Sequence, residues 1–377
     1  MLDPMIEWFQ QAFIGLWKSM RGLFLWLTAP FRGFYRFFVN AGNTLKIIVS
    51  VIVLVLFATY GLFFWNAAWI RGYDINWPDQ FDFQNRTTSA GEQVAAEAGT
   101  ETTRSCGRSG VVDAVRYLVT FNVDENSWIS SHPLYKGGLF GIDWDATPFM
   151  DNKASFQRGV QQAAARVAVE LSDQLGRVRG TSEVDLDLQQ ARGWMQSDQF
   201  TWYFNPFSKL PFGPTTPTQN FYRKAIKAFE NYNRRLESCQ ATFDARADNL
   251  MAMMDRIAKD IGSTSARIKD QSENFNSGWF DFRADNQFYF AKGQLYALYG
   301  LLQGARADFQ QVLEIRRLDD LWANMEAQIK SGLELDPWIV SNGKEDGWIM
   351  PTHLTTMGFY ILRVRSNLIE IRSVLNR

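Results

Sequence analysis

The longest apolar run in the chain extends from Ile47 to Trp65 and contains no charged residue. A helix rises about 1.5 Å per residue, so these residues would span about 28 Å, close to the thickness of a bilayer's hydrocarbon core. Aromatic side chains crowd the end of the run, where a cleaved signal peptide would carry small residues: Phe63, Phe64, Trp65 and Trp69. The pattern therefore predicts one membrane-spanning helix over residues 45–70.

Before this run, apolar residues between positions 5 and 30 recur at three- and four-residue spacing, as on one face of a helix. Lys18 and Arg21 in the middle would be costly in hydrocarbon, so the segment is expected to lie in the membrane interface, with a second span as the alternative. Residues 1–44 are thus predicted to form an amphipathic, aromatic and basic anchor. Contacts with the membrane interface are expected from Trp8, Trp17, Arg21, Arg32, Arg36, Trp65 and Trp69.

After the span, residues 71–105 have the composition of a connection. Residues 71–86 read as an extended exit segment rich in aromatic residues and aspartate. Residues 87–104 are small and polar and offer few core-forming side chains, which is typical of a flexible linker. The folded domain is therefore expected to begin near Cys106 and to occupy residues 106–377.

The first part of that domain alternates helical patterns with loops. Ser109 is a candidate N-cap for a helix that ends near Phe121, and an irregular stretch rich in aromatic residues follows to residue 152. Apolar residues at helical spacing predict helices over 156–175 and 182–197. Residues 198–217 contain four prolines and cannot form a regular element.

The clearest periodicity runs from Tyr222 to Ile268 in heptad steps, with one extra residue of drift near Phe243. It predicts a helix of about fifty residues. A second seam covers residues 291–329, and the short link between the two favours antiparallel neighbours. A last helix is expected over residues 355–375. The fold class is therefore mainly α, an elongated antiparallel helical bundle with long irregular aromatic loops.

Charge around the span predicts its orientation. Five cations precede it, against Asp3 and Glu7, whereas two cations and several acids follow it closely. The N-terminus is therefore expected in the cytoplasm and the domain in the periplasm of a bacterium. Residues 1–71 carry a net charge of +4 and the remainder is mildly acidic, which argues against a nucleic-acid partner.

The chain has two cysteines, Cys106 and Cys239. A periplasmic location permits a disulfide between them, which would close a loop of more than a hundred residues. The alternative is two unrelated thiols, one of them packed in the core.

The residues offer little for catalysis or cofactors. The two histidines are isolated, and no CxxC, HxxxH, phosphate-loop or dinucleotide-binding pattern occurs. Residues 141–151 place carboxylates at odd spacing but lack the glycine and glutamate of a calcium loop. We therefore expect no metal, no cofactor and no enzymatic activity. A hydrolase would require the loops 122–152 and 198–217 to converge on a carboxylate-lined cleft.

One aromatic turn, residues 277–290, is a candidate contact surface. Aromatic residues gathered at one end of a bundle can dock a partner or touch lipid headgroups, and the alternative is that they plug the end of the bundle. The candidate residues are Trp279, Phe280, Phe282, Phe288, Tyr289 and Phe290.

Three stretches carry a family resemblance: RGYDINWPDQF (71–81), FQRGVQQAAARVAVELSDQLGRVRG (156–180) and PTTPTQNFYRKAIKAFENYNRRL (214–236). They are similar to an uncharacterised family of bacterial inner-membrane proteins, catalogued as a domain of unknown function. The resemblance implies a protein of the bacterial envelope and supplies no activity, ligand or site residue.

These observations favour a non-enzymatic structural or interaction role. The predicted protein is a single-pass inner-membrane subunit or scaffold whose periplasmic bundle binds another envelope protein or itself, with the lipid bilayer as its further partner. The alternative is a periplasmic ligand-binding sensory domain that signals through a partner, since helical bundles can hold small molecules between their helices.

Overall fold

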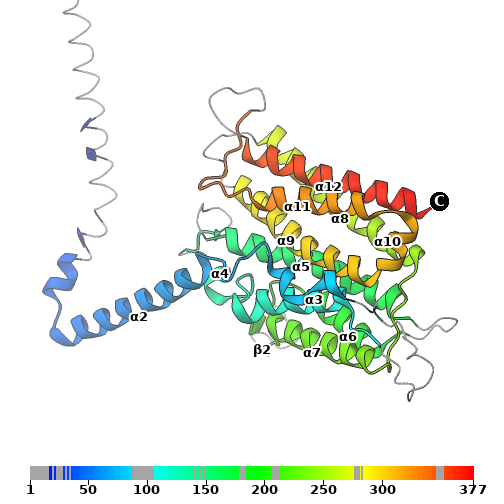
Figure 1. The fold of residues 1–377 in the computed structure, drawn as a ribbon. Coiled ribbons are helices and arrows are strands. Elements are labelled where there is room, and N and C mark those ends of the chain that lie inside the picture. The colour runs from blue at the N-terminus through cyan, green and yellow to red at the C-terminus, as the bar shows by residue number, and fades with distance from the viewer. Residues whose placement is uncertain are drawn as a thin grey trace, which may run out of the picture. The chain divides into compact units, whose positions relative to one another are not determined.

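The computed structural model describes residues 17–377 apart from 19–20, 23–28, 30–31, 34, 87, 89, 91–105, 140, 145–146, 148–149, 178–183, 206–212, 276–280, 282 and 345–351. The chain forms two compact units, residues Met1–Phe63 and Phe64–Arg377. Figure 1 shows helix α2 and, in the second unit, a body built almost entirely of helices. The mainly α fold class predicted from the sequence is confirmed.

Helix α2, Asn43–Ala67, contains the predicted span. It is the one helix among the described residues that is long and apolar enough to cross a membrane, with a mean hydropathy of 2.7. Only 6% of its apolar window is buried, whereas a core helix of a soluble domain would be mostly buried. Leu54 and Phe57, for example, are 69% and 76% exposed. This surface is compatible with a helix surrounded by lipid.

Most of the predicted interfacial helix, including Trp8, lies outside the described residues. The described anchor candidates before α2 present exposed side chains: Trp17, Arg21, Arg32 and Arg36.

The second unit contains ten α-helices among its described residues: α3 (Gly110–Thr120), α4 (Pro133–Gly137), α5 (Asn152–Glu170), α6 (Leu186–Met195), α7 (Thr218–Glu237), α8 (Ala247–Asn274), α9 (Ala284–Asp308), α10 (Gln310–Arg316), α11 (Asp319–Leu333) and α12 (His353–Leu375). Single π-helical turns, Phe121–Glu125 and Leu171–Leu175, extend α3 and α5. The proline-rich loop holds a two-residue antiparallel pair, β1 (Phe204–Asn205) with β2 (Gly213–Pro214).

Helix α9 is the centre of the domain (Figure 1), with α3, α5, α8, α11 and α12 in contact with it. Most of its residues are buried, and these include polar side chains such as Lys292, Gln294 and Asp308. Small residues allow its neighbours to approach. A Cβ on Gly293 would lie 2.1 Å from the carbonyl oxygen of Phe156 on α5, and one on Gly159 of α5 would lie 2.0 Å from that of Phe290.

The two long seams are interrupted, which corrects the predicted fifty-residue helix. The chain turns between α7 and α8 at Cys239, whose φ is 59°, and again after α10 at Arg317, whose φ is 53°. Phe243 lies in the first of these breaks and Phe309 lies in another, between α9 and α10; both are buried and their rings are in contact. The periodicity continues through the turns because residues on both sides face one core. The drift near Phe243 was the only sign of the first break.

The structure places the start of the domain earlier than predicted. Residues 71–86 form two 3₁₀ turns, η1 (Trp77–Phe81) and η2 (Phe83–Asn85), which pack against α9. Trp77 is buried, lies over Gly300 and stacks on Tyr117 with 4.4 Å between ring centroids. The many aromatic residues of this segment therefore belong to the core of the domain. The predicted linker, residues 87–104, lies almost wholly outside the described residues.

Candidate functional site

The proximal end of the domain, residues 64–72 with the loops and helix termini that contact them, is where the chain leaves α2. The ammonium group of Lys153, near the start of α5, donates a hydrogen bond of 2.6 Å to the carbonyl oxygen of Asn66. This carbonyl belongs to the last turn of α2, where cations are favourable. Burial, together with the charge of Arg71, lowers the pKa of Lys153 to about 8.

Two further contacts fix the same segment. The backbone N–H of Arg71 donates to the side-chain oxygen of Asn126 at 2.7 Å, and the Asn126 amide donates back to the Arg71 carbonyl at 3.0 Å. The ring of Phe64 meets Trp144 edge to face, with centroids 5.9 Å apart. The residues that end α2 are therefore held in the domain by hydrogen bonds and packing.

Exposed aromatic residues follow the end of the apolar run. Trp65 and Trp69 are 60% and 56% exposed, and their rings meet edge to face with centroids 6.2 Å apart. The guanidinium of Arg71 lies 6.0 Å from the centroid of the Trp65 ring. Tryptophans beside a cation are typical of the interface between membrane and water. These two predicted anchor residues are thus exposed and lie near a cation.

The predicted aromatic contact surface requires a correction. Phe288 is fully buried in the core, so it cannot contact a partner or lipid. Tyr289 is half-buried against Phe288, and the ring of Phe290 is covered by the guanidinium of Arg267 at 4.4 Å. For Phe288, the structure agrees with the alternative interpretation, in which these aromatic residues close the end of the bundle. Trp279, Phe280 and Phe282 lie outside the described residues.

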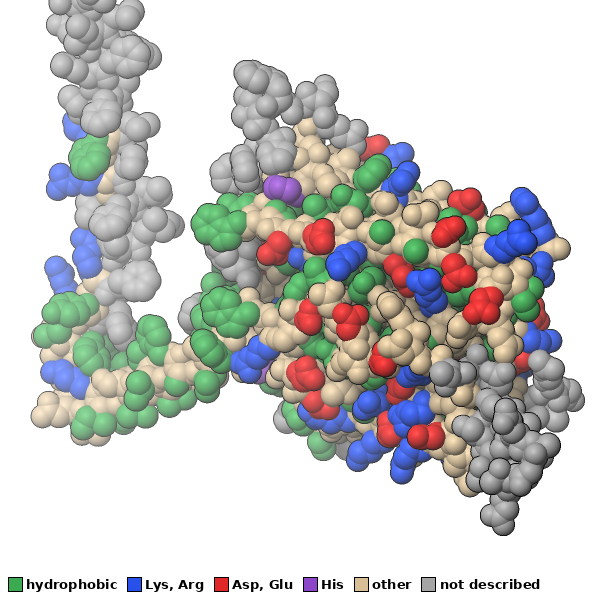
Figure 2. All heavy atoms as spheres, in the orientation of Figure 1, with side chains coloured by type: hydrophobic (Ala, Val, Ile, Leu, Met, Phe, Trp, Pro, Cys, Tyr) green, Lys and Arg blue, Asp and Glu red, His purple; other side chains and the backbone are tan. Residues whose placement is uncertain are grey.

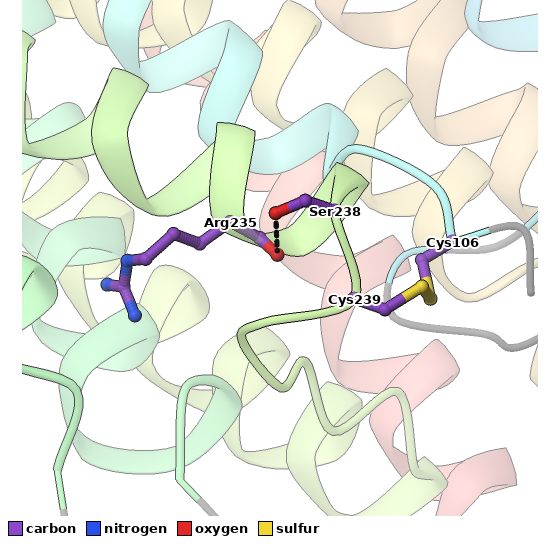
Figure 3. Close-up of a disulfide and its surroundings, with 4 residues drawn as sticks. All are labelled: Cys106, Arg235, Ser238 and Cys239. Atoms are coloured by element: carbon purple, nitrogen blue, oxygen red, sulfur yellow. Dashed lines mark hydrogen bonds between the residues drawn. A yellow bond between two sulfur atoms is a disulfide. The ribbon is translucent and has the colours of Figure 1, made fainter.

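The distal end of the domain holds the disulfide between Cys106 and Cys239, whose sequence separation is 133. Figure 3 shows Cys239 just after the end of α7, where the Ser238 hydroxyl donates to the carbonyl of Arg235. Cys106 lies four residues before α3. The bond therefore ties the segment that leads into α3 to the turn between α7 and α8.

Beside the disulfide, a buried carboxylate caps α3 from another helix. Asp308, the last residue of α9, accepts hydrogen bonds from the Ser109 hydroxyl at 2.6 Å and from the backbone N–H groups of Gly110 and Val111 at 2.7 and 3.0 Å. These N–H groups have no partner within α3 because they belong to its first turn. Burial raises the pKa of Asp308 to about 6, against the opposing effect of the three donors.

A second carboxylate at the same end, that of Asp113, forms ion pairs with two arginines. Arg86 and Arg108 pair with it at 3.0 and 2.9 Å, and the amide of Asn233 donates to it at 2.8 Å. The cluster joins the segment after α2, the start of α3 and helix α7. Its charges are paired with one another, which indicates that the cluster holds these segments together and is not a binding site.

The raised pKa of Asp308 predicts a pH dependence. The carboxyl of Asp308 binds its proton more tightly in the folded domain than in the unfolded chain, where the aspartate pKa is near 3.8. Protonation of Asp308 therefore adds its whole contribution to the free energy of unfolding below pH 4, and this contribution is lost as the pH rises through 6. Between pH 5 and 7 we expect the wild type to lose roughly 1 kcal/mol of unfolding free energy relative to Asp308→Asn. Urea titrations at both pH values measure it, and parallel pH profiles of the two proteins would contradict it.

The loops 122–152 and 198–217 do meet, since the indole N–H of Trp128 donates to the carbonyl of Gln199 at 2.9 Å. Near them lies an open pocket of about 410 Å³, in which Asp143 is the one carboxylate among the described lining residues. Glycoside hydrolysis typically needs a pair of carboxyl groups. The described lining of this pocket therefore offers one carboxylate where that reaction uses two.

A second pocket, of about 260 Å³, lies between α9 and α11 at the distal end. Its Arg306 already pairs with Asp319 at 3.4 Å and with Glu326 at 3.2 Å. Among the described residues no group of three or more His, Cys, Asp or Glu side chains could hold a metal ion.

Comparison with known proteins gives a family match. A family model described as "Uncharacterized protein conserved in bacteria (DUF2333)" matches residues 134–278 and 269–377, which include helices α5 to α12. No curated protein and no solved structure matches the chain.

Proposed function

The chain belongs to the DUF2333 family of uncharacterized proteins conserved in bacteria, and from this premise we propose that it is a membrane-anchored, non-enzymatic structural protein of the bacterial inner membrane. In this proposal α2 crosses the membrane once, the N-terminus is cytoplasmic and the helical domain is periplasmic. The domain acts as a scaffold or subunit that binds another envelope protein. The exposed apolar surface of α2 is the observation that carries the proposal.

Two observations support the periplasmic side. The disulfide between Cys106 and Cys239 needs an oxidising compartment to form and persist. The excess of lysine and arginine before α2 over that after it favours a cytoplasmic N-terminus. Both support a domain outside the cytoplasm, and neither depends on a relative.

Helix α12 supports the scaffold role. Its inner side contacts α8, α9 and α11, whereas Phe359, Leu362 and Ile369 on the other side are 55%, 50% and 42% exposed. Their spacing of three and seven residues places them on one face of the helix. An exposed apolar row of this kind suits contact with a helix of a partner protein.

Extraction of native membranes with a mild detergent tests the scaffold role. We expect the chain in a complex larger than a monomer on native gels, and we expect Leu362→Glu to shift it to a smaller species because a charge would enter the contact. Ile315→Glu, at a residue that is 79% exposed on α10, is the matched control and should leave the complex intact. Recovery of the wild type only as a monomer would contradict the proposal.

A further inference from the structure

The loop between α11 and α12 exposes an aromatic side chain almost completely. Trp338 is 98% exposed and the adjacent Ile339 is 49% exposed, whereas the next residue, Val340, is buried. We infer that Trp338 and Ile339 form a second membrane contact, inserted into the headgroup region of the bilayer that holds α2. This inference rests on the proposed membrane anchoring and names lipid as a direct partner of the domain.

The loop is braced before Trp338. The ammonium group of Lys292 on α9 is buried and donates to the carbonyl of Leu335 at 2.8 Å and to the carboxylate of Asp336 at 3.0 Å. The chain is therefore fixed two residues before the tryptophan.

The loop is braced after Ile339 as well. The amide of Asn342 donates to the carbonyl of Gln271 at 3.1 Å and to the carboxylate of Asp281 at 2.7 Å. The backbone N–H of Ser341 donates to the imidazole of His353 at 3.2 Å. With both flanks held, the outward position of Trp338 and Ile339 is a property of the folded loop.

The braced loop lies at the proximal end of the domain. Tyr73, two residues after Arg71, donates from its hydroxyl to the carbonyl of Leu333 at 3.4 Å. The ammonium group of Lys292 also lies 5.3 Å from the centroid of the Tyr73 ring. Figure 1 shows the start of α12 and the end of α11 at the same end of the body as α4. The loop thus lies beside the chain that has just left α2.

The chemistry of the two side chains fits a lipid surface. Tryptophan is favoured at the headgroup level because its ring is apolar and its N–H can donate a hydrogen bond. Figure 2 shows hydrophobic side chains at this edge of the domain. Glu334 and Asp336 nearby are exposed and acidic, so attraction to anionic lipid does not drive the contact. The contact is driven by insertion of the apolar side chains, so it should also form on zwitterionic lipid.

A spin label tests the contact in the full chain. Ile339→Cys is labelled under non-reducing conditions, in which the native cysteines are occupied by their disulfide, and one copy per nanodisc is reconstituted in zwitterionic lipid. We expect the label to collide several-fold less with a water-soluble nickel chelate, and more with oxygen, than a label at Ile315→Cys. Ile315 is the matched control because it is exposed on α10, which follows the distal end of α9.

A third label, at Leu54→Cys in α2, separates the claim that α2 anchors the chain in the membrane from the claim that the domain contacts lipid. If the Leu54 label is protected from the nickel chelate while the labels at 339 and 315 are equally accessible to it, the domain contact is wrong and the anchoring stands. If the Leu54 label is also accessible, or if the chain does not enter nanodiscs, the anchoring itself is wrong. Protection of the label at 339 that appears only with two copies per disc would identify a protein contact and overturn the lipid contact.

Discussion

Replacing both cysteines, as Cys106→Ala with Cys239→Ala, is expected to lower the free energy of unfolding of the domain by about 2–5 kcal/mol. The disulfide joins residues 133 positions apart, so its loss returns a large amount of conformational freedom to the unfolded chain. It also releases the segment before α3, whose first turn depends on Asp308. Urea denaturation of the full chain in detergent, followed by circular dichroism, measures the change.

Reduction provides the control for this prediction. A reducing agent should destabilise the wild type by a similar amount and should leave the double variant unchanged, because no other cysteine is present. A loss below about 1 kcal/mol in both experiments would show that the bond adds little to the fold.

Replacing Gly159 by alanine is expected to destabilise the domain by about 3 kcal/mol, the upper end of the usual range for overpacking. The added Cβ would lie 2.0 Å from the carbonyl oxygen of Phe290, which belongs to the backbone of α9. A backbone atom cannot move aside as the end of a flexible side chain can, so α5 and α9 would have to separate. The same denaturation experiment measures the loss.

Gly193→Ala is the matched control because it is also a helical glycine, with no atom within 4 Å of its added Cβ. There the substitution should raise stability by up to about 1 kcal/mol, since alanine favours helix more than glycine does. Equal effects at the two positions would contradict the close crossing of α5 and α9.

The elements that the sequence predicts best are helices that bury one face and expose the other. Helix α12 shows its buried residues at helical spacing, and Ser109 marks the start of α3 as its N-cap. Both signals are local, because they depend on neighbours along one helix. The span, α2, is equally visible because its length and lack of charge need no tertiary context.

The turns and the contacts between distant segments could not be predicted in this way. Phe243 and Phe309 continue the apolar pattern through two breaks because the periodicity records which face is buried and not whether the backbone is continuous. Asp308 caps a helix that begins 198 residues before it in the sequence, and nothing local marks that role. The exposure of Trp338 likewise depends on Lys292 and Asn342, which hold its loop from other parts of the domain.

The most direct test of the account is the side of the membrane on which Arg377 lies. Two fusions at this position, one to alkaline phosphatase and one to green fluorescent protein, report the periplasm and the cytoplasm, respectively. A membrane-anchored periplasmic domain predicts an active phosphatase and no fluorescence. Fluorescence with an inactive phosphatase would contradict it.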